Sequence, residues 1–184
     1  MASSLLYTLD PTEANPQPRS VTDFGSNTTT LTGIAPLDDN LYAISGGLHT
    51  SYAFERGSMN LYIVSLEKGT IVDRIPVPDT ATMNGLAFVP HNPHRLLSAD
   101  SIDGRIFSIN TRTREVSVAF DDALLGPSNG NGSSGLLPIA INGLRTRGDF
   151  IYFTNSNQGT FVRCPIDQVG NQAGNFEILA RSPA

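Results

Sequence analysis

The amino-acid sequence predicts an all-β protein, a β-propeller with four-stranded antiparallel blades, of which this chain holds about three and a half. Three observations predict this fold. A short motif, in which a glycine precedes an apolar run, occurs three times, with its glycines at Gly33, Gly85 and Gly143. Two further strand signals follow each motif in the same order. The motif glycines are 52 and 58 residues apart, and a period of about 50 residues with about four strands is typical of a propeller blade. The alternative is a β-sandwich with chance internal similarity.

The clearest unit lies between Ile139 and Ile166. It reads IAINGLRTRGDFIYFTNSNQGTFVRCPI. Strands are expected at residues 140–146, 150–155 and 160–166, because each run is rich in β-branched and aromatic residues and the turns between them contain glycine. The pattern therefore predicts an antiparallel meander, which residues 176–180 complete as a fourth strand.

The other strands are predicted by the same reasoning, in chain order. Two strands joined by a proline-rich turn come first and resemble the outer half of a blade. The expected strands before the clearest unit are 5–9, 19–24, 31–35, 40–45, 60–66, 70–77, 82–88, 96–100 and 104–110, with the blade continuing to residue 120. The serines Ser45, Ser101 and Ser156 are interpreted as equivalent ends of second strands.

These elements give one partial propeller domain over residues 1–184. We expect it to divide into the outer half of a blade (1–30), two blades (31–80 and 81–122), a flexible linker (123–138) and a third blade (139–184). The linker is rich in Gly, Ser and Asn, and it either covers the channel mouth as a lid or simply spans a gap. The insert at residues 46–58 is long for a turn, so it is either a functional loop or a surface Ω-loop.

Composition narrows the class of partner. The net charge is −5, and no basic stripe is available to meet phosphates, which argues against nucleic acid. No run approaches the ~18 apolar residues of a membrane span. The first residues lack a basic segment, so no signal peptide is predicted and a cytoplasmic location is expected.

Cys164 is the one cysteine and is expected to be a buried, inert thiol. His91 and His94 flank a proline and are interpreted as a solvated turn.

Polar side chains recur where the strands meet the predicted channel. Asn84 and Asn142 open two inner strands, and Thr32 opens the third. Amide oxygens at a channel can bind a metal, and amides can hydrogen-bond a ligand, although Asn-Gly is also an ordinary turn signal. The further candidates for substrate contact, taken from the ends of second strands and from the insert, are Asp100, Asn155, Ser156, His49 and Tyr52.

Two segments carry a family resemblance. MNGLAFVP with LLSADSIDGRIFSIN, and INGLRTRGDFIYFTNSNQGTF, resemble the six-bladed propellers of the senescence-marker-protein/gluconolactonase family, and most of all a fungal branch of it. Lactonases of this family hold a divalent metal (Ca, Zn or Mg) with a Glu, two Asn and an Asp. The resemblance implies that Asn142 and Asn84 correspond to the two Asn ligands, while the Glu and Asp positions have no counterpart in these 184 residues.

The fungal branch implies a different chemistry. It includes hetero-Diels–Alderases that join a quinone methide to a sesquiterpene alkene in secondary-metabolite (meroterpenoid) biosynthesis. Such a reaction needs two partners held in one orientation and hydrogen bonds to the quinone-methide oxygen, with no cofactor. We therefore expect a cyclase acting on small molecules. A metal-dependent lactonase is the alternative, and a non-catalytic binding scaffold the second alternative. Because a propeller closes on itself, a second chain or a further segment is expected to complete the ring.

Overall fold

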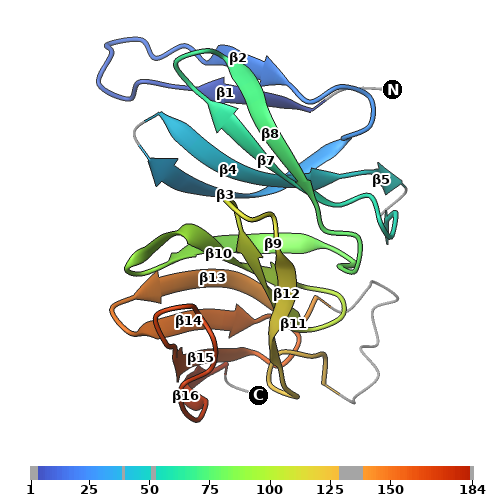
Figure 1. Cartoon of the computed structure of the whole chain (residues 1–184), viewed down its shortest axis with the longest axis vertical. Coiled ribbons are helices and arrows are strands. Elements are labelled where there is room, and N and C mark those ends of the chain that lie inside the picture. Colours follow the sequence, from blue (N-terminus) through green and yellow to red (C-terminus); the bar gives the residue numbers. More distant parts are fainter. Residues whose placement is uncertain (1–3, 39, 51–52, 129–138, 183–184) are drawn as a thin grey trace.

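The computed structural model describes residues 4–38, 40–50, 53–128 and 139–182, and every regular element within these ranges is a β-strand. Three four-stranded antiparallel sheets and one two-stranded sheet are stacked in chain order along the long axis of the molecule (Figure 1). The predicted class, an all-β fold of four-stranded antiparallel blades with three blades complete and one present in part, is confirmed.

Each complete sheet is a meander whose strands pair in sequence order. The partial sheet holds β1 (Leu5–Thr8) and β2 (Arg19–Asp23). The first complete sheet holds β3 (Thr30–Asp38), β4 (Leu41–Gly47), β7 (Asn60–Ser65) and β8 (Thr70–Pro76). The second holds β9 (Met83–Val89), β10 (Asn92–Asp100), β11 (Arg105–Asn110) and β12 (Val116–Asp121). The third holds β13 (Ile141–Arg147), β14 (Phe150–Asn155), β15 (Thr160–Pro165) and β16 (Glu177–Arg181).

The hairpin turns reuse one device. A short polar side chain at the end of one strand accepts backbone N–H bonds from the turn that follows, and the residue four positions on adopts a positive φ. Such a turn reverses the chain into an antiparallel partner. The pairs of capping residue and positive-φ residue are Ser65 with Gly69, Asp100 with Gly104, Asn110 with Arg114, and Asn155 with Gly159.

The core lies between the sheets rather than within them. Where the first complete sheet meets the second, aliphatic residues of both and Phe107 form one buried cluster. Where the second meets the third, the cluster includes Leu97, Ile106, Ile151 and Phe153. Burying apolar faces in this way contributes roughly 25 cal/mol per Å², so each junction between sheets stabilises both of its partners.

Two motif glycines are explained by how closely the inner strands approach each other. A Cβ on Gly33 would lie 2.1 Å from the carbonyl oxygen of Asn84, and a Cβ on Gly85 would lie 2.6 Å from the backbone nitrogen of Leu144. Only glycine allows backbones to come this close. The threefold repeat of the motif therefore records the packing of β3 on β9 and of β9 on β13.

Strand register corrects the predicted equivalence of Ser45, Ser101 and Ser156. Ser45 lies opposite Leu61, and Thr154 lies opposite Phe161, which occupies the same place in its own sheet. The hydroxyl of Ser45 accepts the N–H of Gly33 at 2.8 Å, and that of Thr154 accepts the N–H of Gly143 at 3.2 Å. Ser45 is thus the counterpart of Thr154. The prediction was wrong because β4 continues through Gly47 without the capped turn of the other blades.

Two segments predicted as loop or turn hold more structure than expected. The insert contains a short hairpin, β5 (His49–Thr50) with β6 (Ala53–Phe54). In the segment with two histidines, β10 begins at Asn92, so that only His91, with φ of 67°, remains in the turn. Backbone pairing of His49 with Phe54 and of Asn92 with Val89 places these residues in strands.

The start of the predicted flexible linker is anchored. Leu125 is fully buried in the core cluster between the second and third sheets, and its N–H donates to the carbonyl of Asp122 at 3.0 Å. Residues 129–138, the rest of the predicted linker, lie outside the described ranges. The described part of the segment is therefore a packed turn, held by the buried side chain of Leu125 and by hydrogen bonds to the third sheet.

Candidate functional site

The beginnings of β9 and β13 bring Asn84 and Asn142 together. Both side chains are half-buried, and Asn84 Nδ2 donates to Asn142 Oδ1 at 2.7 Å. Asn142 Nδ2 in turn donates to Ser156 Oγ at 3.2 Å. We call these three residues the rim chain. We call the end of the inner strands at which Asn84 and Asn142 lie the mouth. The predicted proximity of the two asparagines follows from the repeat, because equivalent positions of neighbouring inner strands lie side by side.

The rim chain leaves hydrogen-bonding capacity for a ligand. An amide group has two N–H donors and a carbonyl acceptor. One N–H of each asparagine is used within the rim chain, and among the described residues nothing donates to Asn84 Oδ1. The hydroxyl of Ser156 accepts one bond and is free to donate. The rim chain therefore offers three donors and one acceptor, with each amide held in one orientation by its neighbour.

Thr32, the counterpart in β3, points its hydroxyl elsewhere. Thr32 Oγ1 lies 2.9 Å from Ser45 Oγ, within its own sheet. Further along the same three strands runs a groove of about 250 Å³, lined by Ile34, Pro36, Phe88 and Arg145 among others. The three inner strands thus carry a polar end and a mainly apolar groove, which is the general composition of a small-molecule site.

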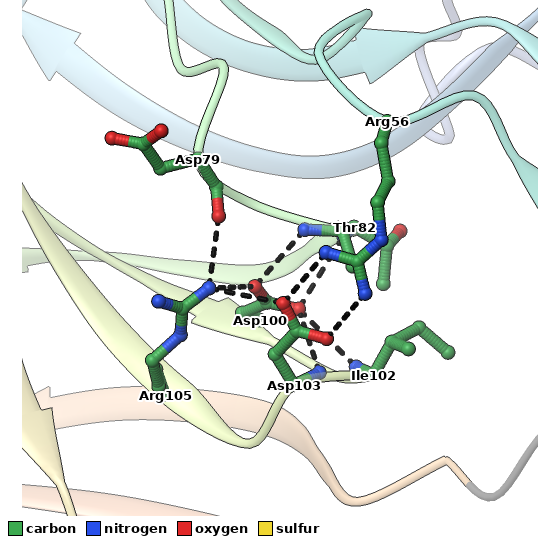
Figure 2. A network of polar contacts seen from close by, with 8 residues as sticks. Arg56, Asp79, Thr82, Asp100, Ile102, Asp103 and Arg105 are labelled. Atoms are coloured by element: carbon green, nitrogen blue, oxygen red, sulfur yellow. Dashed lines mark hydrogen bonds and ion pairs between the residues drawn. The ribbon is translucent and has the colours of Figure 1, made fainter.

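Asp100 is not directed to the mouth. Its side chain is fully buried and accepts the N–H groups of Ala81 at 3.0 Å and Thr82 at 3.4 Å, besides those of its own turn. Arg105 Nη2 lies 3.5 Å from the same carboxylate (Figure 2). Hydrogen bonds and an ion pair satisfy a buried carboxylate in this way. The structure gives Asp100 the role of fixing the entry to β9, and places no atom of it where a substrate could reach.

Asn155 has a similar inward role. It is buried, its Nδ2 donates to the carbonyls of Leu124 at 3.0 Å and Gly126 at 2.7 Å, and its Oδ1 accepts the N–H of Gln158 at 3.0 Å. These bonds tie the segment after β12 to the third sheet. Asp100 and Asn155 therefore behave as a structural pair, one in each blade, rather than as ligand contacts.

His49 lies in the insert hairpin. Its ring meets the ring of Phe54 edge-on with centroids 4.8 Å apart, and its backbone N–H donates to Thr29 Oγ1 at 2.8 Å. No contact joins His49 to the rim chain among the described residues. Tyr52, the other candidate from the insert, lies outside the described residues. The structure thus brings together three of the seven predicted site residues.

The predicted inert cysteine is found buried. Cys164 is fully enclosed in the cluster between the second and third sheets. Burial raises the pKa of its thiol to about 11, with a smaller contribution from the charge of Asp122. A thiol that stays protonated is a poor nucleophile, so Cys164 acts as a small apolar side chain.

The rim chain does not fit the divalent metal that the family resemblance implies. Two asparagines can ligate one ion only if both amide oxygens face it, but Asn142 Oδ1 is turned to the amide nitrogen of Asn84. Within the described ranges no group of three His, Cys, Asp or Glu side chains is close enough to hold an ion. The residues present therefore do not assemble a metal site in this arrangement.

Sequence reasoning missed one feature near the mouth, which is an arginine that links two sheets. Arg56, in the loop after β6, forms two hydrogen bonds with the carboxylate of Asp103 in the β10–β11 turn (Figure 2). The arginine lowers the pKa of this carboxyl below its usual value, mainly through the hydrogen bond and despite partial burial. Separated by 47 positions in the sequence, the two residues carry no local signal that predicts the contact.

Comparison with known proteins identifies the fold. No protein-family model and no curated protein matches the sequence. A chain in the crystal structure of a nidogen/laminin complex is similar with a TM-score of 0.65 at 17% identity, covering 98% of this chain and 62% of that one. Regucalcin, a calcium-binding protein from Agrobacterium tumefaciens, gives 0.55 at 16%, covering 86% and 49%. The Dos1 propeller gives 0.56 at 12%, covering 89% and 37%.

These similarities show a β-propeller fold. The chain spans between 37% and 62% of the length of these three structures. Regucalcin is a senescence-marker-protein-like propeller, so the predicted resemblance is supported at the level of the fold. In addition, none of the described segments is a helix long and apolar enough to cross a membrane.

Proposed function

We propose that this chain forms part of a small-molecule-processing propeller whose mouth binds an oxygen-bearing ligand through Asn84 and Asn142. The observation that carries the proposal is the rim chain itself. Its two amides are half-buried and fixed by a 2.7 Å hydrogen bond, yet each keeps an unused N–H donor. Donors that are already oriented stabilise charge that develops on a bound oxygen without further reorganisation.

The reaction that we propose is an orientation-driven cyclisation, a hetero-Diels–Alder addition of a quinone methide to a sesquiterpene alkene. The C=C–C=O unit and the alkene together lose three π bonds and gain one C–C σ bond, one C–O σ bond and one new C=C π bond, and no proton or redox equivalent is exchanged. Asn84 and Asn142 would donate to the quinone-methide oxygen, on which negative charge grows. The groove beside Ile34 and Phe88 would hold the apolar alkene, so that the two partners react from one geometry.

A metal-dependent lactonase is the alternative. It would require the Asn142 amide to turn its oxygen away from Asn84, together with carboxylate ligands from residues other than those described. The similarity to regucalcin, a calcium-binding protein, is the reason to test it. A non-catalytic scaffold is the second alternative, which a ligand bound at the mouth without turnover would support.

The test compares product handedness. An achiral ortho-quinone methide generated in solution and an achiral sesquiterpene alkene are incubated with the chain, and the enantiomeric excess of the adduct is measured by chiral chromatography. Uncatalysed addition gives a racemate, whereas addition on the protein gives an excess that a chelator does not change. Asn142→Ala and Asn84→Ala should each lower the catalysed rate by about tenfold or more, as expected for loss of an oriented donor.

Asn175→Ala is the matched control, because Asn175 is an exposed asparagine far along the chain from the rim. It should leave the enantiomeric excess unchanged. A racemic adduct at every protein concentration would contradict the cyclase. Hydrolysis of a lactone that stops on addition of a chelator would instead support the metal-dependent alternative.

A further inference from the structure

The insert of the first complete sheet is bonded to itself and to Thr29, and its Phe54 packs against the cluster between the first and second sheets. Its ends are held by Glu55 N–H donating to the carbonyl of Leu48 at 2.9 Å, and by Leu48 N–H donating to Ser58 Oγ at 3.0 Å. These bonds close the loop, while the bonds between His49 and Thr29 tie its start to the first sheet. The one polar link from the insert to the second sheet, within the described residues, is made by Arg56.

The link has a two-point geometry. Arg56 Nη1 and Nη2 donate to Asp103 Oδ2 and Oδ1 at 2.9 and 2.7 Å. A guanidinium and a carboxylate joined at two points define an orientation as well as a distance. Figure 2 shows Arg56 reaching from its own loop to the turn that carries Asp103.

The acceptor is itself held rigidly. Asp103 N–H donates to the buried carboxylate of Asp100 at 3.1 Å. Arg105 Nη2 donates to Asp103 Oδ2 at 3.0 Å and to the carbonyl of Asp79 at 2.8 Å. The guanidinium of Arg105 also lies over the ring of Phe107, 5.1 Å from its centroid. Asp103 is thus a fixed anchor on the second sheet, whereas the side chain of Arg56 is 64% exposed.

The insert begins where the inner strands reach the mouth. Gly47, the last residue of β4, pairs with Thr30 at the start of β3. Two residues later His49 begins the hairpin. Asp103 lies in the turn after Asp100. Ser101 is in the same turn, and its carbonyl accepts the N–H of Ala140, two residues before Asn142. The Arg56–Asp103 pair therefore joins two loops at the end of the sheets that carries the rim chain.

We propose that Arg56 is a positioning residue, which docks the insert hairpin on the second sheet and so sets where His49 and Phe54 lie beside the mouth. The docking stands on the contacts above. Its consequence for ligand selection rests on the proposed function. With the pair intact, the aromatic and imidazole rings of the hairpin, packed edge-on, form a fixed wall for a ligand that the rim chain binds.

Hydrogen–deuterium exchange of the intact chain tests the docking without a ligand. Arg56→Gln should raise exchange several-fold in peptides covering residues 46–58 and leave residues 83–100 unchanged. Arg19→Gln is the matched control, since Arg19 also forms a 2.7 Å ion pair with an exposed side chain, to Glu13 within its own hairpin. It should not alter residues 46–58. If Arg56→Gln leaves exchange in the insert at the level of the Arg19 control, the proposal is wrong.

A second variant separates the pair from general loosening. Asp103→Asn should raise exchange in residues 46–58 as Arg56→Gln does, and the double variant should exchange no faster than the single ones, because both remove the same contact. Additive effects would contradict a direct link.

The functional consequence is read from the enantiomeric excess of the adduct. If Arg56→Gln lowers the enantiomeric excess and leaves the midpoint of thermal unfolding unchanged, the result supports positioning of the hairpin at the mouth. If Arg56→Gln exchanges faster in the insert but the unaltered chain catalyses no reaction, the proposed function is refuted and the docking is retained.

Discussion

The same positions of the sheet are core in one blade and surface in another. The face that the second complete sheet turns to the third carries Ala87, Leu97, Ala99 and Ile106, all buried with at most 6% of their surface exposed. By strand register the counterparts in the third sheet are Arg145, Tyr152, Thr154 and Phe161. No described sheet covers that face, and Phe161 is 39% exposed.

The comparison teaches how much of a blade depends on its neighbour. The third sheet keeps its strand pairing and its turns, so these are local properties of the chain. The composition of the equivalent face of the third sheet is nevertheless different. Tyr152 and Phe161 stack with centroids 6.1 Å apart, and the Arg145 guanidinium donates to the carbonyl of Leu144 at 2.7 Å. Polar groups and ring stacking replace the aliphatic contacts of the covered face.

The largest expected difference is at the motif glycines. Gly85→Val would drive a side chain into the backbone of β13, 2.6 to 2.8 Å from the new Cβ, and should lower the free energy of unfolding by about 3 kcal/mol. Gly143→Val should change it by less than about 0.5 kcal/mol, because the nearest atom to its Cβ is Thr154 Oγ1 at 3.4 Å. Urea unfolding measures both. Equal losses would mean that another sheet covers Gly143 under the conditions of the measurement.

The next difference concerns apolar side chains at one register position. Ile106→Ala leaves a cavity in a closed cluster and should cost about 2–5 kcal/mol. Phe161→Ala removes a side chain that is partly in water and should cost about 1 kcal/mol, mostly the loss of its contact with Tyr152. The midpoint of urea unfolding at constant slope decides between these values. A loss above about 3 kcal/mol for Phe161→Ala would show that its face is covered in solution.

A third prediction separates structural from binding roles at the end of β14. Asn155→Ala removes a buried amide that donates to the carbonyls of Leu124 and Gly126 and accepts the N–H of Gln158, and should cost about 2 kcal/mol. Ser156→Ala should leave stability within about 0.5 kcal/mol and weaken only the binding at the mouth. The reverse result, a stable Asn155→Ala chain that no longer binds ligand, would restore Asn155 as a site residue.

The contrast between Asn155 and Asn142 also shows how far the sequence can be interpreted. The repeat predicted the strands and the meeting of Asn84 with Asn142, because equivalent positions in a repeat fall on neighbouring inner strands. It could not assign Asp100 or Asn155, because an Asp or Asn before a glycine-containing turn suits an Asx turn as well as a ligand. The link from Arg56 to Asp103 depends on how an insert folds back, which no periodic pattern records.

The smallest expected effect concerns two ion pairs. Arg56–Asp103 crosses the junction between the first and second sheets, and Arg163–Glu177 lies within the third sheet. Arg56 lowers the pKa of Asp103, and an unfolded Asp has a pKa of about 3.9. The pair therefore contributes stability above about pH 4, which is lost as the pH falls through the lowered pKa of the folded chain. Because Arg56 is largely exposed to solvent, the contribution should be the smallest of those predicted here. The midpoint of urea unfolding is measured at pH 7 and in acid. On acidification the midpoint of Asp103→Asn should fall less than that of the unaltered chain.

Glu177→Gln, which breaks the Arg163–Glu177 pair between β15 and β16, is the comparison within one sheet. It should leave exchange in the insert unchanged, while Asp103→Asn raises it, since of these two pairs only Arg56–Asp103 joins the insert to another blade.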